Sequence, residues 1–245
     1  MPSLPAFIVV GFVAQMIDGV LGMAYGVSAT TFLLALGVPP AFASASTHAA
    51  ECVTTGLSAL SHFGFGNVDK RLVRALLIPG IAGGILGAYI LVSVPGDLMR
   101  PFTAAYLLIM GIVILSKALR HTVHREVTTH LIPLGLAGGF FDAIGGGGWG
   151  PIVTGTLLAR GNEPRSTIGS VNFAEFFVTI ATAATFLVTI GFTFWKPILG
   201  LAIGGAIAAP FAAWTTKRIS TRPLLAIVGV VVIALSIRTI WLALS

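Results

Sequence analysis

Two stretches decide the fold of this chain, GFVAQMIDGVLGMAYG at Gly11–Gly26 and GGFFDAIGGGGWGP at Gly138–Pro151, because each is a version of the other. When residues 11–51 are aligned with residues 135–175 at an offset of 124, thirteen of the 41 positions are identical. Self-similarity on this scale indicates two copies of one structural unit. The expected boundaries are 1–119 for the first unit, 120–130 for a connecting loop and 131–245 for the second.

Both copies carry the same acids in otherwise apolar surroundings. The four are Asp18, Glu51, Asp142 and Glu175. Acids inside a membrane segment are costly, so they usually face the protein interior or a water-filled path and take part in transport. Because burial favours the neutral form of an acid, we expect these four residues to bind protons and to couple proton movement to transport.

The composition is that of a membrane protein. Hydrophobic residues make up 56% of the chain, charged residues make up 9%, and the mean hydropathy is +0.99. Soluble domains carry about 25% charged residues, so we expect an all-α polytopic membrane protein whose first apolar segment is a retained span. No polar stretch is long enough for a catalytic domain, and the net charge of +6 lies in short loops, which argues against an enzyme and against nucleic-acid binding. A single cysteine, Cys52, excludes an intramolecular disulfide and a four-cysteine metal site.

Eight apolar segments follow one another along the chain. They run at 4–36, 41–63, 72–94, 98–116, 131–159, 166–190, 197–216 and 223–243. Six have the length of one membrane span, about 20 residues. The first and fifth are too long for one span and too short for two, and glycines interrupt them at Gly19–Gly26 and Gly145–Gly150. We expect each of these two segments to be a broken helix.

The basic residues of the loops favour one of two topologies. If each broken segment crosses the membrane once, Lys and Arg divide 8 to 6 between the two sides, which gives no orientation. If each is a helical hairpin that returns to its own side, they divide 11 to 3, in agreement with the positive-inside rule. The hairpin arrangement predicts two inverted repeats, each a glycine-broken hairpin plus three transmembrane helices. It places the chain in the inner (cytoplasmic) membrane with both termini on the non-cytoplasmic side, and the single-crossing alternative stays open.

The helix after each break carries a polar face that is expected to point inward, since a lipid-facing polar stripe would be costly. At the breaks themselves, unpaired backbone N–H groups and helix N-termini can bind an anion. No Lys or Arg lies clearly within an apolar segment, so neutral donors would hold the anion. The candidate substrate-binding residues are Gly22, Tyr25, Gly26, Ser28, Thr30, His48, Gly146, Gly147, Trp149, Gly150, Thr154 and Asn172.

Other interpretations of these residues stay open. The breaks could only allow close helix packing, Tyr25 and Trp149 could be packing aromatics, and His48 could be a satisfied interior histidine. The two glutamates could be structural hydrogen-bond partners, since a duplicated fold also inherits structural residues. No spacing matches a standard metal motif, and the GxGxxG pattern at Gly145–Gly150 lacks the βαβ unit of a nucleotide site, so no cofactor is expected.

Two further motifs add to the quoted stretches: ASTHAAE at Ala45–Glu51 and GSVNFAE at Gly169–Glu175. With these four motifs the sequence resembles the sulfite exporter TauE/SafE family of membrane transporters over essentially the whole chain. The resemblance implies a secondary transporter of small sulfur-containing or organic anions, such as sulfite, sulfonates or sulfoacetate, and fixes neither substrate nor direction. Where the first copy has Thr47-His48 the second has Val171-Asn172, so the two halves of a site would be chemically unequal.

These features together predict a secondary transporter that moves a small anion of the sulfite or sulfonate class across the cytoplasmic membrane, coupled to protons. Its partners would be the anion and the lipid bilayer, and its glycine-rich surfaces would permit a homodimer without requiring one. The main alternative is a cation channel or cation transporter that uses the buried acids as ligands. A membrane-embedded enzyme and a purely structural membrane subunit are weaker alternatives.

Overall fold

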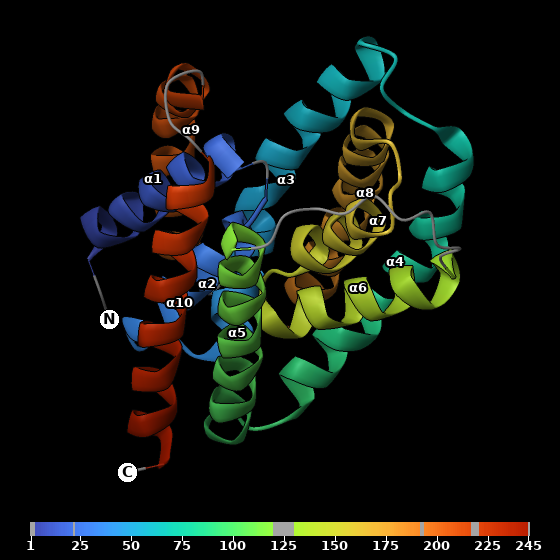
Figure 1. Cartoon of the computed structure of the whole chain (residues 1–245). Helices are drawn as coiled ribbons and strands as arrows, with labels where there is room; N and C mark the ends of the chain where they lie inside the picture. Colours follow the sequence, from blue (N-terminus) through green and yellow to red (C-terminus); the bar gives the residue numbers. More distant parts are fainter. Residues whose placement is uncertain (1–2, 22, 120–129, 192–193, 217–220, 245) are drawn as a thin grey trace.

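A computed structural model describes every residue except 1–2, 22, 120–129, 192–193, 217–220 and 245. Within the described residues, every regular element is a helix (Figure 1). The predicted connecting loop therefore lies almost entirely outside the described residues. The helices are α1 Leu4–Leu21, α2 Tyr25–Ala35, α3 Pro40–Gly64, α4 Lys70–Ser93, α5 Gly96–Leu119, α6 Leu131–Gly145, the π-helical turn η1 Gly150–Thr154, α7 Gly155–Ala159, α8 Pro164–Ile190, α9 Trp195–Thr216 and α10 Thr221–Leu244.

Both long apolar segments are broken where the glycines predict. The first divides into α1 and α2, and Ala24 just before α2 takes a left-handed conformation with φ 87°. The second divides into α6 and the η1–α7 segment, and the intervening Gly146 and Gly147 have φ values of 65° and 154°. Glycine adopts such angles without the steric penalty that a side chain brings, so the second break is well encoded, whereas alanine makes the first one costly.

Four helices within the described residues are long and apolar enough to cross a membrane: α4, α5, α8 and residues 222–244 of α10. Five apolar stretches are shorter, and they include α2, α6 and the η1–α7 segment. With 25 residues, α3 is long enough to span, but its polar face lowers its hydropathy. Its N-terminus has Pro40 at the first helical position and α8 has Pro164 there, where the missing N–H costs no hydrogen bond.

The two copies pack against each other through equivalent surfaces. Helix α1 of the first copy lies on α9 of the second, and α6 of the second lies on α4 of the first. Glycines at equivalent positions make both contacts close, since Gly11 lies against the Leu201 backbone and Gly135 against the Leu76 backbone. Each copy therefore uses the same surface to contact the other copy.

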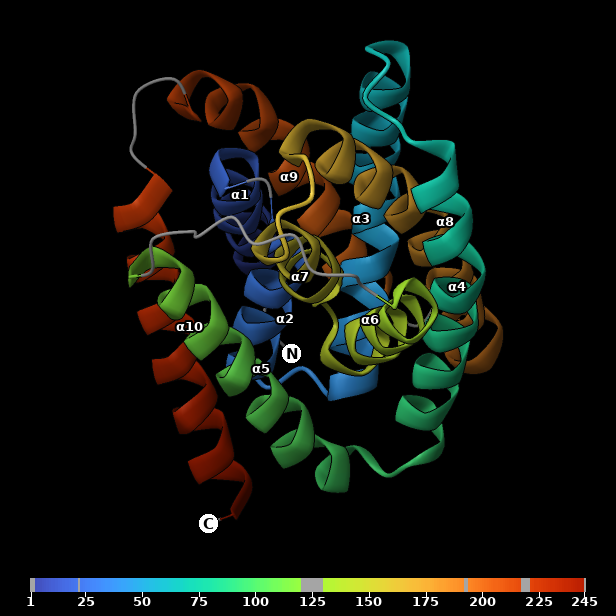
Figure 2. The ribbon, with the colours of Figure 1, turned by 45° about the vertical axis from the view of Figure 1, so that its right-hand side comes forward.

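Among the other contacts between the copies, two join a helix to its own counterpart, and both of these pairs run antiparallel. In the α3–α8 pair, Gly56 packs against the Phe176 ring, and further along α3 the Phe63 ring stacks on Phe173 at 5.6 Å between centroids. Helix α5 runs beside α10 in the same manner, as Figures 1 and 2 show. The short helices α2 and α7 lie in the middle of the bundle, between these pairs (Figure 2).

Candidate functional site

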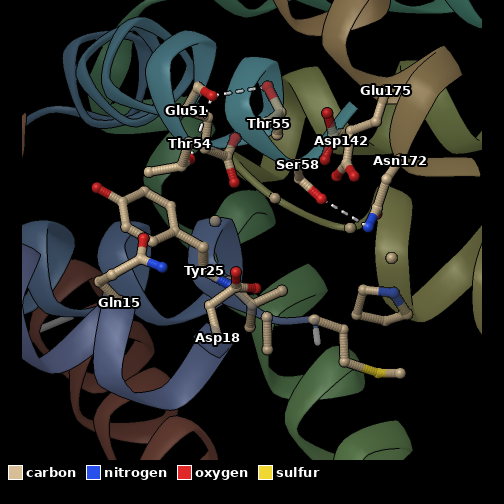
Figure 3. A pocket seen from close by; sticks show the side chains of 18 of the residues that line it. Gln15, Asp18, Tyr25, Glu51, Thr54, Thr55, Ser58, Asp142, Asn172 and Glu175 are labelled. Carbon is tan, nitrogen blue, oxygen red and sulfur yellow. Dashed lines mark hydrogen bonds between the residues drawn. The ribbon is translucent and has the colours of Figure 1, made fainter. Parts of the chain in front are cut away.

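A cavity of about 310 Å³ lies where the two breaks meet the polar faces of α3 and α8. All four predicted acids line it, together with side chains and backbone from both copies (Figure 3). The lining residues are Gln15, Asp18, Met23, Ala24, Tyr25, Gly26, Val27, Glu51, Thr54, Thr55, Ser58, His62, Asp142, Gly147, Gly148, Gly150, Pro151, Ile168, Asn172 and Glu175. Its size suits a small ligand.

The two aspartates make the same contact in the two copies. The carboxylate of Asp18 accepts a hydrogen bond from the Tyr25 N–H at 3.2 Å, and that of Asp142 accepts one from the Trp149 N–H at 2.9 Å. Each aspartate therefore bridges its break, from the last turn of one helix to the first N–H after the interruption. This satisfies a backbone donor that the break leaves without a helical partner.

Asp142 has a second partner that Asp18 lacks. His48 is fully buried, and its Nε2 lies 3.0 Å from the Asp142 carboxylate while its Nδ1 lies 2.9 Å from the Ser44 carbonyl oxygen. Because a carbonyl oxygen only accepts, Nδ1 must carry a hydrogen. Nε2 then faces the Asp142 carboxylate, and both side chains are buried. This buried contact is called the His48–Asp142 clasp below.

Further hydrogen bonds fix the second break to the first copy. Thr30 donates to the Gly146 carbonyl oxygen at 2.7 Å and lies 3.0 Å from the Thr47 hydroxyl. Ser44 donates to the Ala143 carbonyl oxygen at 2.6 Å, and the Tyr106 hydroxyl donates to that of Gly147 at 3.0 Å. The end of α6 is thereby held by α2, α3 and α5.

The two glutamates differ from the aspartates in that they do not bridge a break. Glu51 is 6% exposed, accepts a hydrogen bond from the Gly26 N–H, and interacts electrostatically with Asp18, Asp142 and Glu175. Glu175 faces the same cavity from α8, on the far side from Tyr25 (Figure 3). Four carboxyl groups around one small cavity repel one another when ionised, so their charges depend on each other.

The predicted substrate residues divide into two groups. Tyr25, Gly26, Gly147, Gly150 and Asn172 line the cavity. Gly22 lies outside the described residues. The others are packed behind the wall: Ser28, Thr30, His48, Gly146, Trp149 and Thr154.

Tyr25 and Trp149, which occupy equivalent positions, therefore differ in role. Trp149 is fully buried and donates from its indole N–H to the Val171 carbonyl oxygen at 3.2 Å. These contacts fit the interpretation of Trp149 as a packing aromatic. Tyr25 lies on the cavity wall. Sequence analysis did not name Gln15 as a candidate, although a lone amide in an apolar helix within the first quoted stretch was a usable signal.

One basic side chain, Lys117 at the end of α5, lies close to the cavity wall. Its partly buried ammonium donates to the Pro151 carbonyl oxygen at 3.3 Å and lies 3.8 Å from the Met23 sulfur, and both of these residues line the cavity. Lys117 itself lies behind them, and the described part of the chain contributes no lysine or arginine to the cavity lining. The described residues also hold no group of three His, Cys, Asp or Glu that could bind a metal ion.

Known proteins similar to this chain are membrane transporters by name. The family described as "Sulfite exporter TauE/SafE" matches residues 7–239. A Bacillus subtilis (strain 168) protein described as "Probable membrane transporter protein YtnM" is 43% identical, covering 99% of this chain and 85% of that protein. A Sinorhizobium protein, "Probable membrane transporter protein ORF9", is 27% identical over 94% of this chain and 89% of its own length.

No solved structure matches the chain. The family match nevertheless covers both copies, and the more similar relative covers nearly every residue. Duplicated acids, two broken helices and one shared cavity are the features of a transporter rather than of an enzyme. The chain belongs to the sulfite exporter TauE/SafE family of membrane transporters.

Proposed function

We propose that this protein is a secondary transporter that moves a small anion of the sulfite or sulfonate class together with protons. One observation carries the proposal: both helix breaks and all four duplicated acids meet at a single cavity of about 310 Å³. A substrate in this cavity would touch both copies at once. Its binding would therefore depend on how the copies are placed relative to each other, as alternating access requires.

Proton coupling is proposed from the charges of the wall. The described residues that line the cavity include four carboxyl groups and no lysine or arginine, so an anion would meet repulsion from every ionised carboxylate. When these groups are protonated, the repulsion disappears, and the carboxylic O–H groups join Asn172 and the Ser58 hydroxyl as donors for the anion, while the Thr54 and Thr55 hydroxyls donate to the Glu51 carbonyl oxygen. Anion and protons would thus enter together.

The inverted-repeat arrangement is part of the proposal, and the helix contacts support it. Two copies related by an axis in the membrane plane require each self-paired helix to run antiparallel to its counterpart. Both self-paired contacts, α3–α8 and α5–α10, have this geometry, and α1–α9 and α4–α6 are equivalent to each other. The broken segments would then be hairpins that enter from opposite sides, and both termini would lie outside the cytoplasm.

The cavity would face the cytoplasm in this conformation. It reaches His62 near the end of α3 and Ile168 near the start of α8, close to the loop in which Arg165 donates to the Asn67 carboxamide oxygen at 2.6 Å. This end carries Lys70, Arg71, Arg74, Arg160 and Arg165. By the positive-inside rule it is the cytoplasmic end. The His48–Asp142 clasp lies on the other side of the cavity, where it would close the external path.

The opposite conformation follows from the duplication. The residue equivalent to His48 is Asn172, and the residue equivalent to Asp142 is Asp18. In the present structure Asn172 donates to the Ser58 hydroxyl at 3.2 Å instead, and both Asn172 and Asp18 line the open cavity. We propose that Asn172 closes on Asp18 when the His48–Asp142 clasp opens, so that one gate is shut at a time.

Transport by purified protein in liposomes tests the proposal. A sulfonate gradient is imposed across the membrane, and the internal pH is followed with a trapped dye. Sulfonates suit the test because they stay ionised near neutral pH, so proton movement cannot come from diffusion of a neutral acid. Sulfonate entry should acidify the interior, and the Glu175→Gln variant should abolish this signal. Sulfonate entry that leaves internal pH unchanged in the wild-type protein would contradict proton coupling.

The same liposomes address the alternative of a cation site. A cation that binds carboxylates competes with protons, so its entry would make the interior more alkaline. Family membership favours the anion. If Na⁺ or K⁺ makes the interior alkaline while no sulfonate or sulfite changes the internal pH, the cation alternative is favoured. The proposed anion transport would then be wrong, and only the fold assignment would stand.

A further inference from the structure

We propose that the cavity has a polar notch, formed by Gln15, Tyr25 and Gly205, that binds a hydroxyl group on the substrate. The inference rests on the proposed function and refines it, because it selects hydroxylated short-chain sulfonates over unsubstituted ones. It concerns the end of the substrate away from the sulfonate group. The anionic end would stay with the donors around the four carboxyl groups.

Two buried oxygens in this notch have no hydrogen-bond partner. The side-chain carbonyl oxygen of Gln15 and the hydroxyl of Tyr25 are both unpaired, in residues that are 8% and 3% exposed. Buried polar atoms in folded proteins are nearly always paired, because an unpaired one costs most of its hydration free energy. Both residues line the cavity and lie next to each other on the side away from Asn172 (Figure 3). A ligand group placed there would satisfy both.

Gly205 on α9 is not among the cavity-lining residues, but it lies beside both oxygens. A Cβ at this position would lie 3.8 Å from the Gln15 carbonyl oxygen and 3.9 Å from the Tyr25 hydroxyl oxygen. The two unpaired atoms therefore approach the same point, and that point carries no side chain. In the second copy the equivalent of Gln15 is Gly139, which packs directly against the Gly80 backbone. The notch is thus a property of one copy and is not explained by the duplication.

The pair of atoms specifies the chemistry of its ligand. The Gln15 oxygen only accepts, while the Tyr25 hydroxyl both donates and accepts. A hydroxyl group can donate to the first and accept from the second, so one group satisfies both atoms. A methyl group satisfies neither, and it leaves both polar atoms buried against an apolar neighbour. The notch should therefore distinguish 2-hydroxyethanesulfonate from ethanesulfonate, which share the charged end.

Affinity for this pair of probes is the test, measured by ligand-induced thermal stabilisation of the full-length protein in detergent. One added hydrogen-bonded group should give the wild-type protein a preference of about three- to tenfold for the hydroxylated probe. Tyr25→Phe removes only the hydroxyl and should reduce the preference to about one. Gly205→Ala fills the notch at van der Waals distance and should do the same.

Tyr106→Phe is the matched control, because the Tyr106 hydroxyl is also buried but donates to the Gly147 carbonyl oxygen at 3.0 Å. It should keep the preference and lower the Tm of the ligand-free protein, whereas Tyr25→Phe should raise that Tm by removing an unpaired hydroxyl. The proposed hydroxyl-binding notch would be contradicted if the wild-type protein had equal affinity for both probes, or if the preference survived in Tyr25→Phe and Gly205→Ala. Failure of the wild-type protein to bind or transport any sulfonate or sulfite would instead contradict the proposed function.

Discussion

The two copies keep the same aspartate and the same backbone contact, but they surround it differently. Both aspartates line the cavity, but Asp142 is 3% exposed and contacts both the Trp149 N–H and His48, whereas Asp18 is partly buried and accepts from the Tyr25 N–H. The shared contact bridges the helix break in both copies, and Asp142 has a buried histidine partner in addition. Duplication therefore supplies the framework of the site, and the divergence between His48 and Asn172 supplies its asymmetry.

The stability cost of removing each aspartate should show the largest contrast. Asp142→Ala leaves a buried histidine and a buried N–H without their partner, which costs about 3–5 kcal/mol. Asp18→Ala loses one hydrogen bond at a partly hydrated position, which costs about 1 kcal/mol. Thermal unfolding in detergent measures both. Equal losses would show that the His48–Asp142 clasp adds nothing to the break it covers.

The equivalent glycines of the two breaks give the next contrast. A Cβ on Gly26 would lie 2.6 Å from the Gly147 Cα and 2.8 Å from the Gly146 oxygen, which are backbone atoms of the other break. Among the described residues, a Cβ on Gly150 would meet Met23 alone, with the Cβ at 3.2 Å and the Cα at 3.7 Å. Gly26→Ala should therefore cost about 1–3 kcal/mol and Gly150→Ala less than about 1 kcal/mol. If Gly150→Ala is the more damaging of the two in thermal unfolding, the breaks do not meet as described.

Making the two gates alike should shift the conformational balance. Asn172→His gives Asp18 the partner that Asp142 already has, and this should stabilise the conformation in which the cytoplasmic path is closed. A cavity cysteine, Thr55→Cys in a Cys52→Ser background, should then react about fivefold more slowly with a water-soluble maleimide added from the cytoplasmic side. Labelling at the unmodified rate would contradict the proposed pairing of Asn172 with Asp18.

The smallest contrast concerns the N-termini of α3 and α8. Glu163 caps α8 by accepting from the N–H groups of Ser166 and Arg165, at 2.7 and 2.9 Å, and these bonds lower the pKa of Glu163 below its ordinary value of 4.5. The equivalent residue before α3 is Pro39, whose side chain makes no such bond.

Because the folded-state pKa of Glu163 is lowered, its contribution to stability is present above pH 4.5 and is lost as the pH falls through the lower folded-state value. The Tm difference between the wild-type protein and Glu163→Gln should therefore shrink on acidification below this range. The difference is expected to be small, because the group is exposed. A difference that is constant down to acidic pH would show that the carboxylate charge does not contribute.

Much of the fold could be predicted because it depends on composition and on backbone chemistry. The helix interruptions follow from glycine at Gly146 and Gly147, and the helix starts follow from Pro40 and Pro164. The meeting of the four acids at one cavity agrees with the expectation that buried acids face inward. These features need no knowledge of how the helices cross.

The rest depends on crossing geometry, which a sequence pattern does not contain. Tyr25 and Trp149 have equivalent positions, but only Tyr25 reaches the cavity, because Trp149 is enclosed by α4 and α8. His48 is turned onto Asp142 by its place opposite the second break. Lys117 reaches the interior because Gly155 leaves room for its ammonium. Each of these outcomes is set by a residue in another helix.

In the proposed mechanism, an anion and protons bind together at the cavity where the two breaks meet. Proton exchange during binding can be measured with 2-hydroxyethanesulfonate or sulfite added to purified protein in weakly buffered detergent near neutral pH. Protons should be taken up from solution as the anion binds, and Glu175→Gln should reduce the uptake. Anion binding with no proton uptake, or with proton release, would contradict the proposed mechanism.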